Sequence, residues 1–262
     1  MLTHLLLRFL IGGIIVCGFA AISDVLKPKS FAGLFGAAPS VALATLWMTI
    51  SLEGKTYAAV ETRSMIAGAA AFFIYASCAT WLLMKGQWSS LSVTVSLIPV
   101  WLAASLGLWF LLLRQIFLNI SVNLSALRQA KWYQFAMRFL FGGAICVLAG
   151  IIANKYGPAV GGLFMAFPAI FPASATLLEN EQKEKKERAG LHGTIRGRRV
   201  AGIDAAGAAM GSIGMMAFAA IVWGLLPKQP APTVLIGATA AWFGVSVFVW
   251  HMRSMWVHSR KR

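Results

Sequence analysis

Charged residues are scarce in this chain of 262 residues, of which 12% are charged and 59% are hydrophobic. A soluble domain typically has roughly 25% charged and 45–50% apolar residues. The mean hydropathy of +0.74 is correspondingly high. This composition excludes an ordinary soluble domain and predicts an integral membrane protein.

Cysteines and catalytic motifs are also scarce. The three cysteines, Cys17, Cys78 and Cys146, form no C-x-x-C pair, so the sequence supports neither a zinc site nor a disulfide framework. It contains no H-E-x-x-H, G-x-S-x-G or P-loop motif and no paired carboxylates within an apolar run. We therefore predict that the protein is not an enzyme, and we expect no cofactor and no metal.

Acidic residues are much rarer than basic ones, 8 against 23, which gives a formal net charge of +15. The basic residues cluster between the apolar runs, where such residues set membrane topology and meet anionic lipid headgroups. The chain lacks the motifs and the basic–aromatic pattern of nucleic-acid-binding domains. The expected partners are the lipid bilayer and its anionic headgroups, with no nucleic acid.

One stretch of the sequence occurs twice. Residues 8–13 (RFLIGG) recur as residues 138–143 (RFLFGG) at an offset of 130, and a Gly-Leu-Phe-x-Ala-x-Pro motif recurs at an offset of 129. The recurrence in mid-chain also favours a retained first helix over a cleaved signal peptide. A repeat of this length predicts two related halves.

The apolar runs divide the chain into eight candidate spans, since a transmembrane helix needs about 20 apolar residues. The predicted spans are 5–23, 31–52, 64–84, 91–113, 139–153, 159–178, 200–226 and 233–250. The predicted fold is thus an all-α membrane protein with eight transmembrane helices. Its predicted domains are 1–118, a cytoplasmic or interfacial linker at 119–137, and 138–262.

The distribution of basic residues predicts the orientation of these spans. With the N-terminus inside, 18 of the 23 basic residues lie on the inner side. This bias predicts that both termini are cytoplasmic. Four spans in each half then insert both halves in the same direction, as two parallel four-helix repeats.

Asp204 is the one acidic residue well inside a predicted span. Charge within a membrane is costly and usually functional, so Asp204 is a candidate acceptor for a proton or cation, or a polar contact for a substrate. The alternative is a shallow position paired with Arg199 or another arginine. Gly207 and Gly211 follow in the same span and predict close helix contact.

The repeated motif supplies the remaining candidates. Glycine allows close helix approach, whereas proline within a span interrupts the helix. Matched prolines in two halves predict broken helices around a central site, unless they only shape the packing. The candidate substrate-binding residues are therefore Asp204, Pro39, Pro168, Pro172, Gly33 and Gly162.

The motif resembles that of the GlpM-like family of small bacterial inner-membrane proteins, a domain of unknown function. The matching residues are Gly33, Leu34, Ala37 and Pro39, and again Gly162, Leu163, Ala166 and Pro168. The resemblance implies two fused copies of a four-span unit in a bacterial inner membrane. One family member is associated with alginate production, which implies a link to envelope polysaccharide.

Two functional hypotheses follow. The first is a small transporter or permease with a site between the two repeats, because the proline-containing spans are duplicated. The alternative is a non-catalytic membrane partner of an envelope or polysaccharide biosynthesis complex, because polar groups are few within the spans and Glu179–Arg199 forms a long charged loop. We also consider a homo-oligomer or a membrane complex as the assembled form. A lipid-modifying enzyme has little support, since no acid–base pair is visible.

Overall fold

The computed structural model describes residues 2–26, 28–111, 139–140, 142–149, 151–152, 158–168, 170–190 and 192–259. All regular secondary structure in these residues is helical, which confirms the all-α prediction. The elements are α1 (Leu2–Val25), α2 (Lys29–Ala32), the 3-10 helix η1 (Gly33–Ala37), α3 (Ser40–Leu52), α4 (Lys55–Lys85), α5 (Ser90–Ser96), α6 (Ile98–Leu111), α8 (Pro158–Met165), α9 (Phe171–Glu187), α10 (Thr194–Leu225) and α11 (Ala231–Ser259). The described parts of residues 139–152 are also helical.

Several helices are long and apolar enough to cross a membrane. Within the described residues, five segments meet this criterion: Lys29–Leu52, Lys55–Lys85, Ser90–Trp109, Thr194–Leu225 and Ala231–Met255. A further apolar helix, Phe9–Ser23, is shorter. The predicted linker 119–137 lies outside the described residues.

Both motif copies interrupt a predicted span. In the first half, η1 ends at Ala37, and α3 begins at Ser40 directly after Pro39. In the second half, α8 ends at Met165 and α9 begins only at Phe171, with Pro168 in the gap. The prediction of broken helices is confirmed, because proline has no N–H to continue the hydrogen-bonding pattern. Pro172 instead occupies the first turn of α9, where a helix tolerates proline.

Two predicted loops are wrong, because they are largely helical. Residues 53–63, which the predicted spans 31–52 and 64–84 left as a polar loop between them, contain the first turns of α4, which begins at Lys55. The predicted charged loop 179–199 is helical as far as Glu187, where α9 ends. Oppositely charged side chains one turn apart support this extension of α9. The pairs are Lys183–Glu187, Glu181–Lys185 and Glu184–Arg188.

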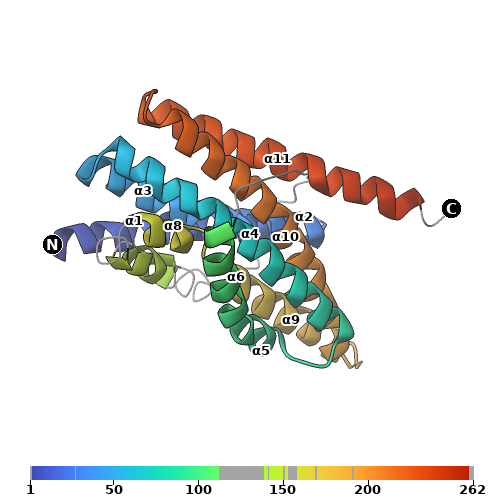
Figure 1. Cartoon of the computed structure of the whole chain (residues 1–262). Coiled ribbons are helices and arrows are strands. Elements are labelled where there is room, and N and C mark those ends of the chain that lie inside the picture. The colour runs from blue at the N-terminus through green and yellow to red at the C-terminus, as the bar shows by residue number, and fades with distance from the viewer. Residues whose placement is uncertain are drawn as a thin grey trace.

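Helices α4 and α10 pack along each other in opposite directions (Figure 1). At one end, Lys55 Nζ at the start of α4 donates to the carbonyl of Gln229 beyond the end of α10, at 2.8 Å. At the other end, Arg198 near the start of α10 donates to the carbonyl of Gly86 just after α4, at 2.9 Å. The two helices hold the same place in their respective halves, so the halves are inverted relative to each other.

The first helices of the two halves repeat this inversion. A Cβ added at Gly12 would overlap Cys146, and a Cβ added at Gly142 would overlap Val16. Val16 and Cys146 are equivalent positions, 130 residues apart, as are the two glycines. Such reciprocal contacts arise when two related helices cross about an approximate two-fold axis.

The predicted parallel arrangement of the two repeats is therefore wrong. It depended on a count of basic residues that assumed one crossing for each apolar run, whereas the contacts show equivalent helices meeting in opposite directions. The N- and C-terminal ends also lie at opposite ends of the bundle in Figure 1.

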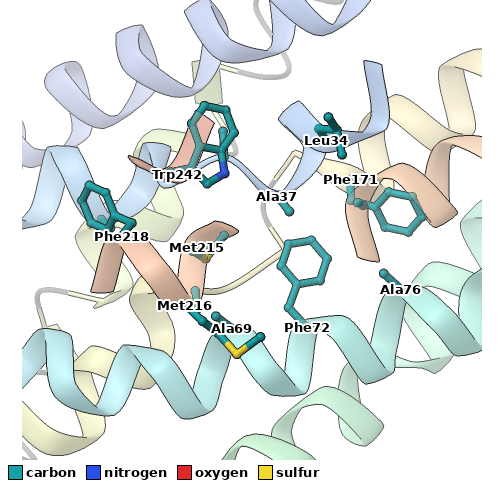
Figure 2. Close-up of a cluster of buried hydrophobic side chains, with 14 of the residues drawn as sticks. Leu34, Ala37, Ala69, Phe72, Ala76, Phe171, Met215, Met216, Phe218 and Trp242 are labelled. Carbon is teal, nitrogen blue, oxygen red and sulfur yellow. The ribbon is translucent and has the colours of Figure 1, made fainter. Parts of the chain in front are cut away.

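The two halves share one hydrophobic core. Figure 2 shows the region where η1 meets α4, α9, α10 and α11. Its labelled side chains are Leu34 and Ala37 from η1, Ala69, Phe72 and Ala76 from α4, Phe171 from α9, Met215, Met216 and Phe218 from α10, and Trp242 from α11. All of them are buried. The predicted units 1–118 and 138–262 thus interleave.

Candidate functional site

Asp204 lies deep between the two halves. Its side chain on α10 is only 1% exposed. The hydroxyl of Ser174 on α9 donates to Asp204 Oδ2 at 3.3 Å. From the other half, Gly33 of η1 approaches so closely that an added Cβ would overlap the carbonyl group of Asp204. We call Asp204, Ser174 and Gly33 the Asp204 site.

A second buried acid, Glu61, was missed in the sequence. It lies on α4 and is fully buried. An added Cβ at Gly162 of α8 would overlap the Glu61 carbonyl and the hydroxyl of Ser64. Gly162 is the repeat equivalent of Gly33, so Glu61 occupies the place that Asp204 has in the other half. We call Glu61, Ser64 and Gly162 the Glu61 site.

A signal for Glu61 was present in the sequence. Each acid is followed, seven residues later, by a glycine in an alanine-rich stretch: Gly68 after Glu61 and Gly211 after Asp204. Alignment of these glycines brings the two acids into register. The prediction that residues 53–63 form a loop placed Glu61 outside the spans and hid this match.

The two acids lie near opposite ends of the α4–α10 pair. Close to Glu61, the Arg63 guanidinium lies 5.3 Å from the ring centroid of Trp223. Close to Asp204, Gly202 lies against Leu83 and Met84. About 20 residues of α4 therefore separate the two levels, or about 30 Å at 1.5 Å per residue. The two acids therefore occupy equivalent positions in the two halves, at different levels of the α4–α10 pair.

The predicted site residues divide between these two places. Asp204 and Gly33 are in contact, and Pro172 lies two residues before Ser174 in the same helix turn. Gly162 belongs to the Glu61 site instead. The two remaining candidates lie at the helix breaks. Pro39 follows η1, and Pro168 follows α8.

The interface between the halves is tightly packed. A Cβ added at Gly68 would meet the carbonyl of Leu163, and one added at Gly211 would overlap the carbonyl of Leu34. These contacts are again equivalent by repeat, and they confirm the predicted close approach at Gly211. Small residues allow helix backbones to pack at this distance. Tightly packed helices therefore enclose both acids.

The described residues contain no group of three or more His, Cys, Asp and Glu side chains that could hold a metal ion. A groove on the outer surface is apolar and has neither acid in its lining. It is lined by Ile11, Ile15, Leu43, Trp47, Pro232, Leu235, Ile236 and Thr239. The polar chemistry between the halves thus centres on the two acids and their serine neighbours.

The sequence model of one family, described as "Protein of unknown function (DUF3147)", matches residues 5–117 and 135–255. The chain belongs to this family. The two matches cover most of the chain and agree with two repeated copies of one unit. No curated protein and no solved structure matches the chain.

Proposed function

We propose that this DUF3147 protein is a multi-pass membrane transporter that works by alternating access. The observation that carries the proposal is the inverted pair of broken helices, each packed over a buried acid of the other half. Many secondary transporters combine inverted repeats with discontinuous helices at the repeat interface. Movement of one half against the other would then expose one end of the interface at a time.

The proposal places membrane spans in both halves but does not keep the predicted total of eight, because four spans in each half would insert both halves in the same direction. The end of the bundle that holds Arg198 is richer in basic residues. Among the residues whose side chains the structure describes, this end has Lys29, Lys85, Lys183, Lys185, Lys186, Arg188, Arg196, Arg198, Arg199 and Arg253, and the other end has Lys55, Arg63 and Lys228. The positive-inside rule makes the Arg198 end cytoplasmic and the opposite end external. We further propose that the protein lies in the bacterial inner membrane and is related to the GlpM-like family.

In this mechanism the two acids are the polar contacts of the transport path. An ionisable group within a membrane is costly unless it serves a function. The Asp204 site lies nearer the Arg198 end and the Glu61 site nearer the opposite end. Each acid would therefore become accessible from its own side, where it binds a proton, a cation or a polar group of the substrate.

Flux into liposomes tests this proposal. Purified protein should accelerate the uptake of protons or monovalent cations above that of protein-free vesicles. Asp204→Asn should lower the rate at least about tenfold, the cost of losing one charged contact. Glu53→Gln is the matched control, because Glu53 is exposed. Absence of flux for every tested solute, together with unchanged behaviour of Asp204→Asn in cells, would reject the transporter.

The second candidate function is a non-catalytic membrane partner of an envelope biosynthesis complex. The tight interface between the halves favours it, as does the exposed charged end of α9 at 180–188. Replacing the charged side chains of this segment by Gln tests the candidate. Loss of function in cells with unchanged helix content and unchanged flux would support a partner role.

A further inference from the structure

A cluster around Arg198 ties together one end of the α4–α10 pair. Arg198 donates to the carbonyls of Gly86 and Gln87, at 2.9 and 3.0 Å, and to Glu179 Oε1 at 3.0 Å. Glu179 also accepts the backbone N–H of Ser90, at the start of α5. We call Arg198 and Glu179, with these partners, the Arg198 clasp. It connects α4, α5, α9 and α10.

The chemistry of this clasp suits its position. The carbonyls after Lys85 belong to the C-terminal end of α4, where they lack helical partners and attract a cation. Glu179 is 7% exposed, so its attraction to Arg198 is screened less than that of a surface pair. Opening this end of the bundle requires several charge-assisted hydrogen bonds to break together.

Lys55 occupies the equivalent position at the other end. Lys55 binds the carbonyl of Gln229, as Arg198 binds that of Gly86. The two cations are 143 residues apart, and so are the two carbonyls. We call Lys55 and the Gln229 carbonyl the Lys55 clasp. It consists of one hydrogen bond of 2.8 Å from an exposed lysine.

The Lys55 clasp lacks the acid of the Arg198 clasp. The position 129 residues before Glu179 is Ile50, an apolar residue that cannot pair with Lys55. A solvent-exposed contact of this kind contributes little to stability. The repeat therefore preserves the cation and its carbonyl acceptor at both ends, while the ion pair is built at one end only.

We propose that the two clasps are latches of unequal strength, and that the Lys55 end opens more readily than the Arg198 end. The proposal rests on the transport function inferred above. At rest the Asp204 site stays closed by the Arg198 clasp. The Glu61 site is reached first, from the external side, when the Lys55 clasp breaks.

Spin-label distances at each end of the bundle test this inference in lipid nanodiscs. One label pair, Glu53→Cys with Gln229→Cys, reports the Lys55 end, and Gln87→Cys with Arg196→Cys reports the Arg198 end. The background carries alanine at the three native cysteines, Cys17, Cys78 and Cys146. We expect an additional longer distance for the first pair and a single distance for the second.

Substitutions of the two cations give the sharper result. Lys55→Gln should raise the open fraction at its end about twofold, and Arg198→Gln should raise that at the other end at least about tenfold. Lys228→Gln and Arg199→Gln are the matched controls, since both residues are exposed neighbours. Arg198→Lys keeps the charge but offers fewer hydrogen bonds, so the Arg198 end of this variant should open to an intermediate extent. This variant also provides a test if Arg198→Gln does not fold.

Two outcomes would overturn the inference: a larger open fraction at the Arg198 end of the wild-type protein, or clasp variants indistinguishable from their controls. Flux measured on the same samples separates the two proposals. Unequal opening of the two ends without flux would support the unequal clasps and reject transport. Flux with equal opening at both ends would support transport and reject unequal latches.

Discussion

The backbone of Gly33 packs directly on the backbone of Asp204, although the two residues belong to different halves of the chain. Gly162 and Glu61 repeat this contact with the halves exchanged. Each half thus completes the acid site of the other. Neither site is complete in one half alone.

Membrane orientation is the first prediction, and labelling of single cysteines tests it. Glu53→Cys and Lys228→Cys should react together with a membrane-impermeant thiol reagent on intact cells, because Lys55 and Gln229 meet at one end. Gln87→Cys and Arg196→Cys should react only after permeabilisation, because Arg198 and Gly86 meet at the other end.

The parallel arrangement predicts a different pattern. In that arrangement positions 87 and 228 lie together on the outer side, while positions 53 and 196 lie inside. If the cysteines at positions 87 and 228 both reacted on intact cells, and those at 53 and 196 were both protected, the repeats would be parallel and the inverted arrangement would be rejected.

The second prediction concerns the contact between Gly33 and Asp204. Gly33→Val should lower the free energy of unfolding by more than about 3 kcal/mol, because its side chain meets backbone atoms that cannot move aside. Gly162→Val should have a similar effect. The measurement is the thermal unfolding temperature in one detergent.

Gly237→Ala is the control for these variants. A Cβ at Gly237 meets nothing within 4 Å, and alanine favours a helix more than glycine does. Its unfolding temperature should stay constant or rise. A small effect of Gly33→Val would show that η1 and α10 are not in close contact.

Much of this architecture was predictable because it follows from local pattern. The all-α class follows from the apolar runs. The two interruptions follow from Pro39 and Pro168, because proline lacks the N–H that a continuing helix requires, whatever the surrounding fold. The close approach at Gly211 was predictable for a similar reason, since a small residue in an alanine-rich helix marks a packing face.

The direction of the second half was not predictable in this way. Parallel and inverted repeats have the same hydropathy and the same motifs. They are distinguished by contacts between distant residues, such as that of Gly33 with Asp204. The same limit hid the role of Glu61. Its place in the sequence is polar, and only the packing of α8 against α4 buries it.

The third prediction assigns Glu61 the same importance as Asp204. Glu61→Gln should lower flux by about the same factor as Asp204→Asn, at least about tenfold, because the two acids occupy equivalent sites. Both variants should keep the wild-type helix content. Normal flux in Glu61→Gln with strongly reduced flux in Asp204→Asn would show that only one of the two sites serves transport.

The fourth prediction compares two tryptophans in equivalent surroundings. Trp101 packs on Phe164, and Trp242 packs on Phe35, with ring centroids 5.7 and 5.4 Å apart. The Trp101 indole N–H donates to the Gly68 carbonyl at 3.2 Å. The buried N–H of Trp242 has no hydrogen-bond partner among the described residues.

Replacement by phenylalanine should therefore affect the two positions differently. Both variants lose similar ring area, but Trp101→Phe also loses a buried hydrogen bond, whereas Trp242→Phe removes a donor that is costly to bury unpaired. Trp101→Phe should be the less stable of the two by about 1–3 kcal/mol. Thermal unfolding of both variants in one detergent measures this difference. Equal unfolding temperatures would mean that the Trp101–Gly68 hydrogen bond does not contribute to holding α6 against α4.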